Sequence, residues 1–383
     1  MTSRIIGYYT TQFGELWDKS LFNLVEEAII GVLNTTNIEP GTIDAIFFGN
    51  MLAGILENNL HAGAKIADIF GLNIPIFRVE SACASGGIAF HLAYEYVQSK
   101  KGKTVLIIGA EKMTDVQPEY ITQGLISAAS GEEQESGITF PGLYALMARI
   151  YMKKYKYNEK NLAAVAVKNH AHGVLNPSAH FRKSITVEQV LNSPIVANPL
   201  KLLDCSPVSD GASSLIITSN QSLIKQKGGV HILTSQTATD SISLLRRDSL
   251  IGLKATRIAA EKAFTESKLQ RKEISLAEVH DCFTIAELFA MEDIGFWKKG
   301  EAGQKAIDYE TLISNGGNLI VNTSGGLKAS GHPVGATGVK QLGELYLQLT
   351  QQANKRQVKN VKYGLAHNVG GSGGTAVVSI LGV

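Results

Sequence analysis

The stretch Val79-Glu80-Ser81-Ala82-Cys83-Ala84-Ser85-Gly86-Gly87 places one thiol in a turn of small residues, directly before an amphipathic segment at 88–98. A cysteine at a helix N-terminus lies near the positive end of the helix dipole and near free backbone N–H groups, and both lower the pKa of a thiol. The pattern therefore predicts a nucleophilic Cys83. A structural cysteine buried in a tight turn fits the same residues, so this stretch alone leaves both interpretations open.

A second glycine-rich turn, residues 322–338, carries His332 and Pro333 just before another predicted helix at 337–352. It is the counterpart of the Cys83 turn in the other half of the chain. An imidazole in this position can accept the thiol proton and later support an oxyanion. The alternative is a turn histidine solvated at the surface, although so many Gly, Ser and Pro residues are unusual for that purpose.

The segment His280-Asp281-Cys282-Phe283 lies at the end of a strand predicted at 278–281. Chemistry in α/β proteins concentrates at the carboxyl ends of strands. Residues i and i+2 of an extended chain point to the same side, so His280 and Cys282 are predicted to face one cavity. A buried core histidine and a small buried cysteine are the alternative interpretation.

A glycine run follows His367 and Asn368 and leads into a strand, with no Lys-Ser/Thr pair, so it does not indicate a phosphate-binding loop. Its backbone N–H groups are suited to hold an oxyanion. His170, His172 and His180 lack a matching carboxylate or thiol spacing, and we therefore expect no metal site.

Predicted helices alternate with short β-branched strands, which indicates an α/β fold. The order of strand, Gly/Ser turn, helix, strand and terminal strand occurs twice, which indicates an internal duplication. We predict halves at 1–225 and 226–383, with an inserted subdomain at about 115–203 that covers a cleft. The predicted strands are 45–49, 105–109, 214–218, 278–281, 362–366 and 375–381, and the predicted helices are 21–34, 86–98, 142–154, 253–265 and 337–352.

The composition excludes several classes of partner. The 383 residues include 36 basic and 34 acidic side chains, a formal charge of +2, which gives no reason to expect nucleic acid or an anionic membrane. No signal-peptide pattern and no membrane-length apolar run are evident. Because the three cysteines form no C-x-x-C pair, we expect a reducing, cytoplasmic setting.

Together these motifs resemble the thiolase superfamily, specifically the sterol-carrier-protein-type thiolases, which include the archaeal acetoacetyl-CoA thiolases. The resemblance covers essentially the whole chain. It implies duplicated βαβαβαββ halves in five layers (αβαβα) with an inserted loop subdomain. It also implies a homodimer or homotetramer that uses coenzyme A thioesters as substrates, with no bound cofactor and no metal, and with CoA lying under the loop subdomain.

The resemblance also implies residue roles. Cys83 is acylated, His332 activates it, and His280 stands beside the first oxyanion site in place of an asparagine. Backbone N–H groups of Cys83 and Gly370 form the second oxyanion site. Ordinary thiolases place an acid/base cysteine where this chain has Asn368, and in the resembling subgroup Cys282 takes that role. Substrate contacts are expected from Met147, Thr256, His367 and Asn368, whereas Cys205 is expected to be structural.

The function implied is acetyl-CoA C-acetyltransferase activity, that is, Claisen condensation of two acetyl-CoA molecules to acetoacetyl-CoA, or the reverse thiolysis. Three alternatives share the fold: a ketoacyl synthase-like condensing enzyme, a thiolase-like aldolase subunit, and a non-catalytic scaffold that binds acyl-CoA. Archaeal members of the resembling group imply two further partners, a 3-hydroxy-3-methylglutaryl-CoA synthase and a zinc-ribbon/OB-fold protein that binds CoA.

Overall fold

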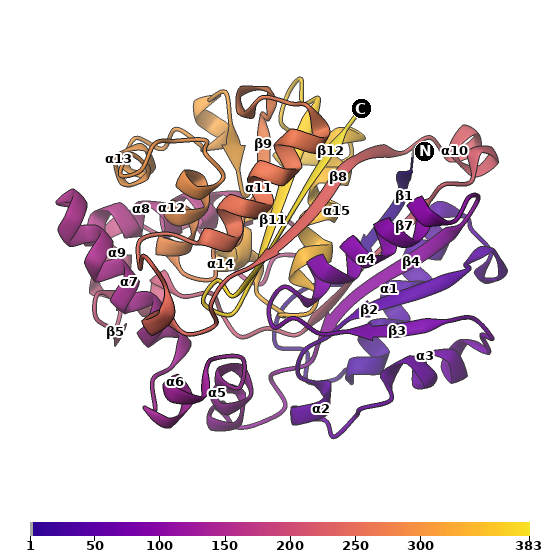
Figure 1. The fold of residues 1–383 in the computed structure, drawn as a ribbon, viewed down its shortest axis with the longest axis horizontal. Coiled ribbons are helices and arrows are strands. Elements are labelled where there is room, and N and C mark those ends of the chain that lie inside the picture. The colour runs from indigo at the N-terminus through magenta and orange to yellow at the C-terminus, as the bar shows by residue number, and fades with distance from the viewer. Residues whose placement is uncertain (1–2) are drawn as a thin grey trace.

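A ten-stranded sheet runs through the computed structural model, which describes residues 3–383 (Figure 1). The strand order is β10-β9-β11-β12-β8-β1-β7-β4-β2-β3. In chain order these strands are β1 (Arg4–Thr10), β2 (Ala45–Gly49), β3 (Ile76–Val79), β4 (Thr104–Glu111), β7 (Gly211–Thr218), β8 (Val230–Thr239), β9 (Leu276–Glu278), β10 (Ile320–Val321), β11 (Tyr363–Gly370) and β12 (Thr375–Gly382).

The sheet consists of two equivalent halves joined at its centre. Read outward from the centre, the first half is β1-β7-β4-β2-β3 and the second is β8-β12-β11-β9-β10, so each strand has a counterpart in the other half. Strands β1 and β8 join the halves by antiparallel pairing of Arg4 with His231 and Ile5 with Val230. The predicted duplication is therefore confirmed, but these two central strands are absent from the strands that we predict from the sequence.

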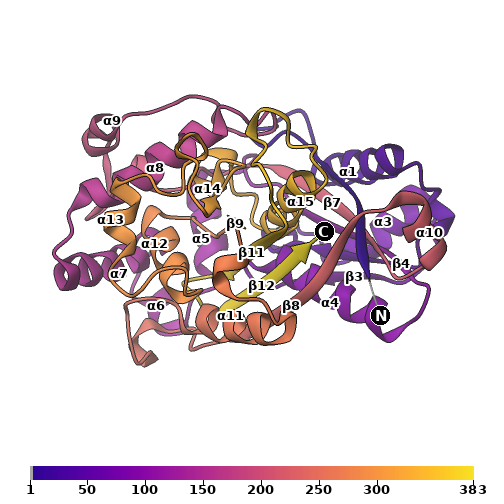
Figure 2. The ribbon, with the colours of Figure 1, turned by 90° about the horizontal axis from the view of Figure 1, so that it is seen from above.

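Helices form three further layers around and between the halves (Figures 1 and 2). Helix α1 (Leu21–Thr36) packs on β1, β4 and β7 at one outer face, and α11 (Lys254–Ser267) packs on β8 and β12 at the other. Helices α4 (Ser85–Ser99) and α15 (Thr337–Leu349) lie side by side in the middle layer. One buried cluster contains apolar side chains of α4, α15 and strands from both halves, as the five-layer prediction requires.

Glycines let the two middle helices approach closely where each begins. A Cβ on Gly338 would lie 2.3 Å from the backbone nitrogen of Gly87, and one on Gly86 would lie 2.5 Å from the carbonyl oxygen of Gly335. Real Cβ atoms do not tolerate such distances, so only glycine fits. The crossing brings the turn before α4, with Cys83, next to the turn before α15, with His332.

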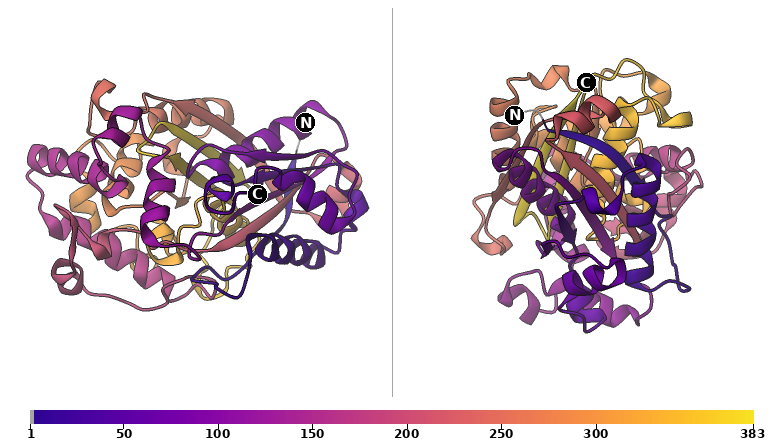
Figure 3. Two further views of the ribbon diagram at one scale, coloured as in Figure 1. Left: turned by 90° about the horizontal axis from the view of Figure 1, so that it is seen from below. Right: turned by 90° about the vertical axis from the view of Figure 1, so that its right-hand side faces the viewer.

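The segment between β4 and β7 forms the predicted inserted subdomain. Its elements are α5 (Pro118–Ile126), α6 (Gly131–Glu135), α7 (Phe140–Tyr155), α8 (Glu159–Gly173), α9 (Val187–Asn192) and a small sheet of β5 (Ile195–Ala197) and β6 (Leu200–Lys201). Helices α5 and α6 lie beneath the sheet in Figure 1 and in the right-hand view of Figure 3. The division that we propose after residue 225 falls within α10 (Gln221–Lys227), between the two halves.

Smaller helices complete the second half and the outer layer of the first: α2 (Ala53–Leu56), α3 (Ala62–Phe70), α12 (Thr284–Asp293), α13 (Ala302–Ile307) and α14 (Gly326–Ser330). Strand β9 ends at Glu278, earlier than the predicted 281, so His280 and Cys282 follow the strand rather than belonging to it. In residues 3–383 no helix has both the length and the apolar character needed to cross a bilayer.

Candidate active site

Three side chains from distant parts of the chain meet below the α4–α15 crossing. The sulfur of Cys83 and one ring nitrogen each of His280 and His332 all lie within 4.8 Å of one another. The two imidazole rings meet edge to face with centroids 5.1 Å apart. Cys83 lies between β3 and α4, His280 follows β9, and His332 lies between α14 and α15. The structure thus brings together three of the residues that the sequence singled out.

A cavity of about 470 Å³ opens beside Cys83, His332 and Cys282. Its walls are largely apolar. Ile121, Leu125, Phe140, Tyr144, Val196 and Val208 come from α5, α7 and the segments after them, and Phe283 comes from the second half of the chain. Cys205 also lines this cavity, so all three thiols of the chain border it. The inserted subdomain therefore forms the apolar wall that faces the candidate nucleophile.

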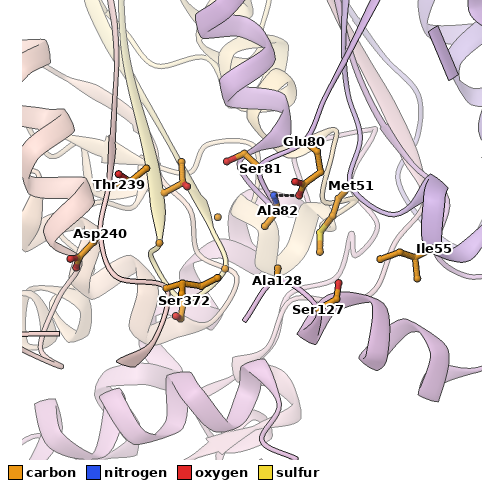
Figure 4. A pocket seen from close by; sticks show the side chains of 15 residues that line it. Met51, Ile55, Glu80, Ser81, Ala82, Ser127, Ala128, Thr239, Asp240 and Ser372 are labelled. Atoms are coloured by element: carbon orange, nitrogen blue, oxygen red, sulfur yellow. Dashed lines mark hydrogen bonds between the residues drawn. The ribbon is translucent and has the colours of Figure 1, made fainter. Parts of the chain in front are cut away.

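The backbone at the nucleophile is held in an uncommon conformation. Ala82 has φ of +50°, a left-handed value that costs a non-glycine residue about 1 kcal/mol or more. The Glu80 carboxylate accepts its N–H at 2.6 Å (Figure 4). The Ser85 hydroxyl accepts the Ser81 N–H and donates to the Ala82 carbonyl. These bonds stabilise a sharp turn that presents Cys83 ahead of α4.

The cavity drawn in Figure 4, about 590 Å³, lies on the other side of this turn. Met51 and Ile55 line it on one side and Thr239 and Ser372 on the other, together with Gly370 and Gly371. Gly371 borders both cavities, and its backbone N–H points at the sulfur of Cys83. Gly370, expected beside the second oxyanion site, is therefore adjacent to the glycine whose N–H reaches the sulfur.

The predicted low pKa of Cys83 is not found. Burial raises the pKa of the Cys83 thiol to about 12, and this outweighs the N–H groups of Gly371 and of Cys83 itself, which lower it. Burial likewise raises the pKa of Cys282 well above its ordinary value. Both groups are therefore neutral thiols in the resting site, and a thiolate forms only when a base takes the proton.

Hydrogen bonds prepare His332 to be that base. Its Nδ1 lies 2.7 Å from the Thr337 hydroxyl, whose single proton is donated to the Pro333 carbonyl at 3.0 Å. The hydroxyl must therefore accept, which places the ring proton of His332 on Nδ1. Burial lowers the pKa of His332 to about 3, so the ring is neutral. Its Nε2 thus carries a lone pair, is buried, and has no hydrogen-bond partner within residues 3–383.

Buried carboxylates hold the two turns together. Glu111, at the end of β4, accepts N–H groups from Met51 and Leu52 in the first half and from Gly335 in the second. Asp281 accepts the N–H groups of Leu327 and Lys328 at the start of α14. These contacts tie the His332 turn to both halves, so its position relative to Cys83 depends on the whole fold.

The four residues expected to contact substrate do not line the cavity beside Cys83 within the described chain. Met147, a residue of α7, is fully buried in the apolar core. Thr256 and His367 are fully buried and contact each other at 2.8 Å, and the backbone N–H of His280 points at His367. Asn368 contacts His280 at 3.1 Å. These four residues therefore lie behind the site and support its side chains.

Two residues of the site have no assigned role in the sequence analysis. The Tyr144 hydroxyl, 3.1 Å from the Gly371 carbonyl, also faces the thiol of Cys282. Nothing in the pattern of α7 distinguishes this tyrosine from a core residue. Thr337 lies inside the glycine-rich turn at 322–338, five residues after His332, and this spacing is the feature of the sequence that could have indicated a contact between the two side chains. His170 and His172 instead bond to backbone carbonyls and serve the structure.

Family models match both halves of the chain. The model for "Thiolase, N-terminal domain" matches residues 3–221, and that for "Thiolase C-terminal domain-like" matches 236–383. The acetyl-CoA acetyltransferases of Methanothermobacter thermautotrophicus and Methanocaldococcus jannaschii are each 44% identical to the chain, over 98% of both sequences. Sterol carrier protein 2 of Oryctolagus cuniculus is 32% identical and is matched over 92% of this chain and 71% of its own length.

Solved structures share the fold. The Ltp2–ChsH2(DUF35) aldolase superposes with a TM-score of 0.85 at 22% identity, and human mitochondrial 3-ketoacyl-CoA thiolase with 0.73 at 17%. Each match covers 100% of this chain and 98% of the other. At such identities the likeness concerns the fold alone.

Proposed function

The chain belongs to the thiolase family and is an acyltransferase, and we propose that it joins two molecules of acetyl-CoA into acetoacetyl-CoA and CoA through an acyl-Cys83 intermediate. The observation that carries the proposal is the convergence of Cys83, His280 and His332. Cys83 and His332 line one cavity together with Cys282. The two relatives at 44% identity bear the name acetyl-CoA acetyltransferase, which supports acetyl-CoA as substrate.

Acylation begins with proton transfer from the Cys83 thiol to Nε2 of His332. The sulfur attacks the acetyl carbonyl, and backbone N–H groups of Cys83 and of Gly370 or its neighbour Gly371 hold the oxyanion. The C–S bond to CoA breaks, and the departing CoA thiolate takes the proton of Cys282. Acetyl-Cys83, a Cys282 thiolate and a protonated His332 remain, and their opposite charges stabilise each other.

Condensation reverses these proton movements. The Cys282 thiolate removes an α-proton from a second acetyl-CoA, and the enolate oxygen is held by His280 and by protonated His332. The enolate carbon attacks acetyl-Cys83, and the Cys83 sulfur leaves and recovers its proton from His332. Two acetyl-CoA molecules thus become acetoacetyl-CoA and CoA, with both thiols restored. Thiolysis is the same sequence in reverse.

Mass spectrometry after incubation with acetyl-CoA tests the assignment. The wild type should gain one acetyl group on the peptide that contains Cys83, and Cys83→Ala should gain none. Cys282→Ala should also be acetylated, because protonated His332 can return its proton to the departing CoA thiolate. Cys282→Ala should also lose exchange of α-protons into deuterium oxide. Cys205→Ala, the third thiol at the cavity, is the matched control and should retain both reactions.

The same measurement distinguishes the alternatives. Turnover by Cys83→Ala, or acetylation of another residue, would exclude the proposed nucleophile and favour an aldolase or a scaffold. Condensation that requires malonyl-CoA would indicate a ketoacyl synthase. Acyl-CoA esters of increasing length, offered in the same assay, would measure which acyl groups the 470 Å³ cavity accepts.

We propose that the protein forms a homodimer in which the β3 strands of the two copies pair with each other. Strand β3 is at one end of the sheet, so one of its edges lacks a neighbouring strand among the described residues. Phe77 on β3 is 46% exposed and Leu92 on α4 is 42% exposed, and both border one shallow hollow.

Two further protein partners, a zinc-ribbon/OB-fold protein and a 3-hydroxy-3-methylglutaryl-CoA synthase, stay predictions. The aldolase of similar fold contains a DUF35 protein.

A further inference from the structure

The side-chain amide of Asn368 is enclosed where α4 and α15 cross. Its Oδ1 accepts the backbone N–H of Gly87 at 3.1 Å, and its Nδ2 donates to the Cys83 carbonyl at 3.1 Å. A Cβ on Gly338 would lie 2.4 Å from this Oδ1, so glycine leaves the space that the amide fills. Exchanging the oxygen and nitrogen would oppose N–H to N–H and carbonyl to carbonyl. The amide therefore has one orientation.

That orientation determines which nitrogen of His280 carries the proton. The Nδ2 of Asn368 lies 3.1 Å from Nδ1 of His280, and an amide nitrogen only donates. Nδ1 must therefore be the lone-pair atom. Burial lowers the pKa of His280 well below its ordinary value, so the ring is neutral and its one proton is on Nε2. This Nε2 is buried and, like that of His332, has no hydrogen-bond partner in the part of the chain that the structure describes.

The two histidines therefore offer opposite functions at the sulfur of Cys83. His332 offers a lone pair, because Thr337 holds its proton on Nδ1, and His280 offers an N–H. A base and an oxyanion donor are what the proposed reaction needs at these two positions.

The same three residues have the composition of a zinc site. Zinc binds Cys and His, and ligand atoms around tetrahedral zinc are about 3.3 to 3.6 Å apart. The three atoms here already lie within 4.8 Å, so shifts of about 1 Å or less would complete the ligand set. Zinc needs a lone pair on the Nε2 of His280, however, and a metal-bound histidine usually donates its other N–H to a carboxylate or carbonyl. The Nδ2 of Asn368 cannot accept that proton.

We propose that Asn368 is a positioning residue that sets the tautomer of His280, and that by this choice it supplies the N–H for catalysis and keeps the cluster of Cys83, His280 and His332 from binding zinc. The part that concerns catalysis rests on the proposed function, whereas the tautomer and the exclusion of zinc rest on the contacts alone.

Asn368→Asp tests the proposal by a gain of metal binding. One carboxylate oxygen accepts the Gly87 N–H, and the other, although it now faces the Cys83 carbonyl, accepts a proton on Nδ1 of His280, which frees Nε2. Zinc affinity, measured on metal-free protein against a competing chelator, should rise about 10- to 100-fold. Co²⁺ added in place of zinc should show a thiolate-to-cobalt charge-transfer band in this variant and not in the wild type.

Two variants serve as controls. Asn315→Asp adds the same charge at an exposed site that is not among the residues lining the cavity beside Cys83, and it should leave zinc affinity unchanged. Asn368→Asp with His280→Ala should lose the gain, because the third ligand is missing. Equal zinc affinity in Asn368→Asp and Asn315→Asp, or a gain that survives His280→Ala, would overturn the proposal.

Neutron diffraction on the deuterated wild type keeps the proposal testable if the variant does not fold. Density for deuterium is expected on Nε2 of His280 and on Nδ1 of His332; deuterium on Nδ1 of His280 would overturn the assignment. In Asn368→Asp the condensation rate should fall about 10²- to 10³-fold while acetyl-Cys83 still forms. Failure to acetylate wild-type Cys83 would refute the proposed function and leave the tautomer assignment standing.

Discussion

At the scale of single residues, the site works with neutral groups. A pKa of about 12 for Cys83 and about 3 for His332 means that both are uncharged across the physiological range. Charge separates only when substrate arrives and the proton moves. The Nε2 of His332 carries a lone pair, whereas the Nε2 of His280 carries a proton. His332 therefore accepts the proton of Cys83, and His280 only donates.

The raised pKa of Cys83 predicts that no thiolate is present in the resting enzyme. Burial disfavours the anion, so deprotonation is displaced to higher pH, and below about pH 9 the fraction of thiolate should be small. The difference in ultraviolet absorbance between the wild type and Cys83→Ser measures it, with Cys205→Ser against the wild type as the control. A thiolate signal at neutral pH would show that the helix N-terminus prevails over burial.

At the scale of elements, the crossing of α4 and α15 positions the chemistry. Gly338→Ala places a Cβ against the backbone of Gly87 and the amide of Asn368, neither of which can move freely. We expect a loss of about 1–3 kcal/mol in the free energy of unfolding, together with slower acetylation of Cys83. Chemical denaturation at fixed protein concentration measures the first and mass spectrometry the second.

Gly131→Ala, at the start of α6, is the matched control for this substitution. A Cβ there meets nothing within 4 Å, so stability should change by about 0.5 kcal/mol or less. Equal effects of the two substitutions would contradict the role given to the close approach of the helices.

At the scale of the whole molecule, the exposed edge of β3 predicts how copies associate. Phe77→Glu introduces a charge into the apolar edge, so it should shift the protein from dimer to monomer in sedimentation velocity. Trp17→Glu changes an aromatic side chain that is 70% exposed elsewhere and should leave the dimer intact. A Phe77→Glu protein that remains dimeric would place the interface on another surface.

By itself, the sequence determined the elements whose periodicity is strong and the motifs that identify the family. Strand β2 begins and ends at the predicted residues, and α1, α4, α7 and α11 lie within two residues of their predicted bounds, because a buried face repeats clearly along each. Cys83, His280 and His332 were named from their motifs, and they lie together.

Only the tertiary structure decided what depends on partners from elsewhere in the chain. Strands β1 and β8 carry polar residues and are strands because each pairs along its length with a distant strand of its own half, β1 with β7 and β8 with β12. The pKa of Cys83 follows from its burial, and the proton on His280 follows from Asn368, 88 positions away. Desolvation and hydrogen-bond direction depend on which groups surround an atom, and local sequence does not contain that information.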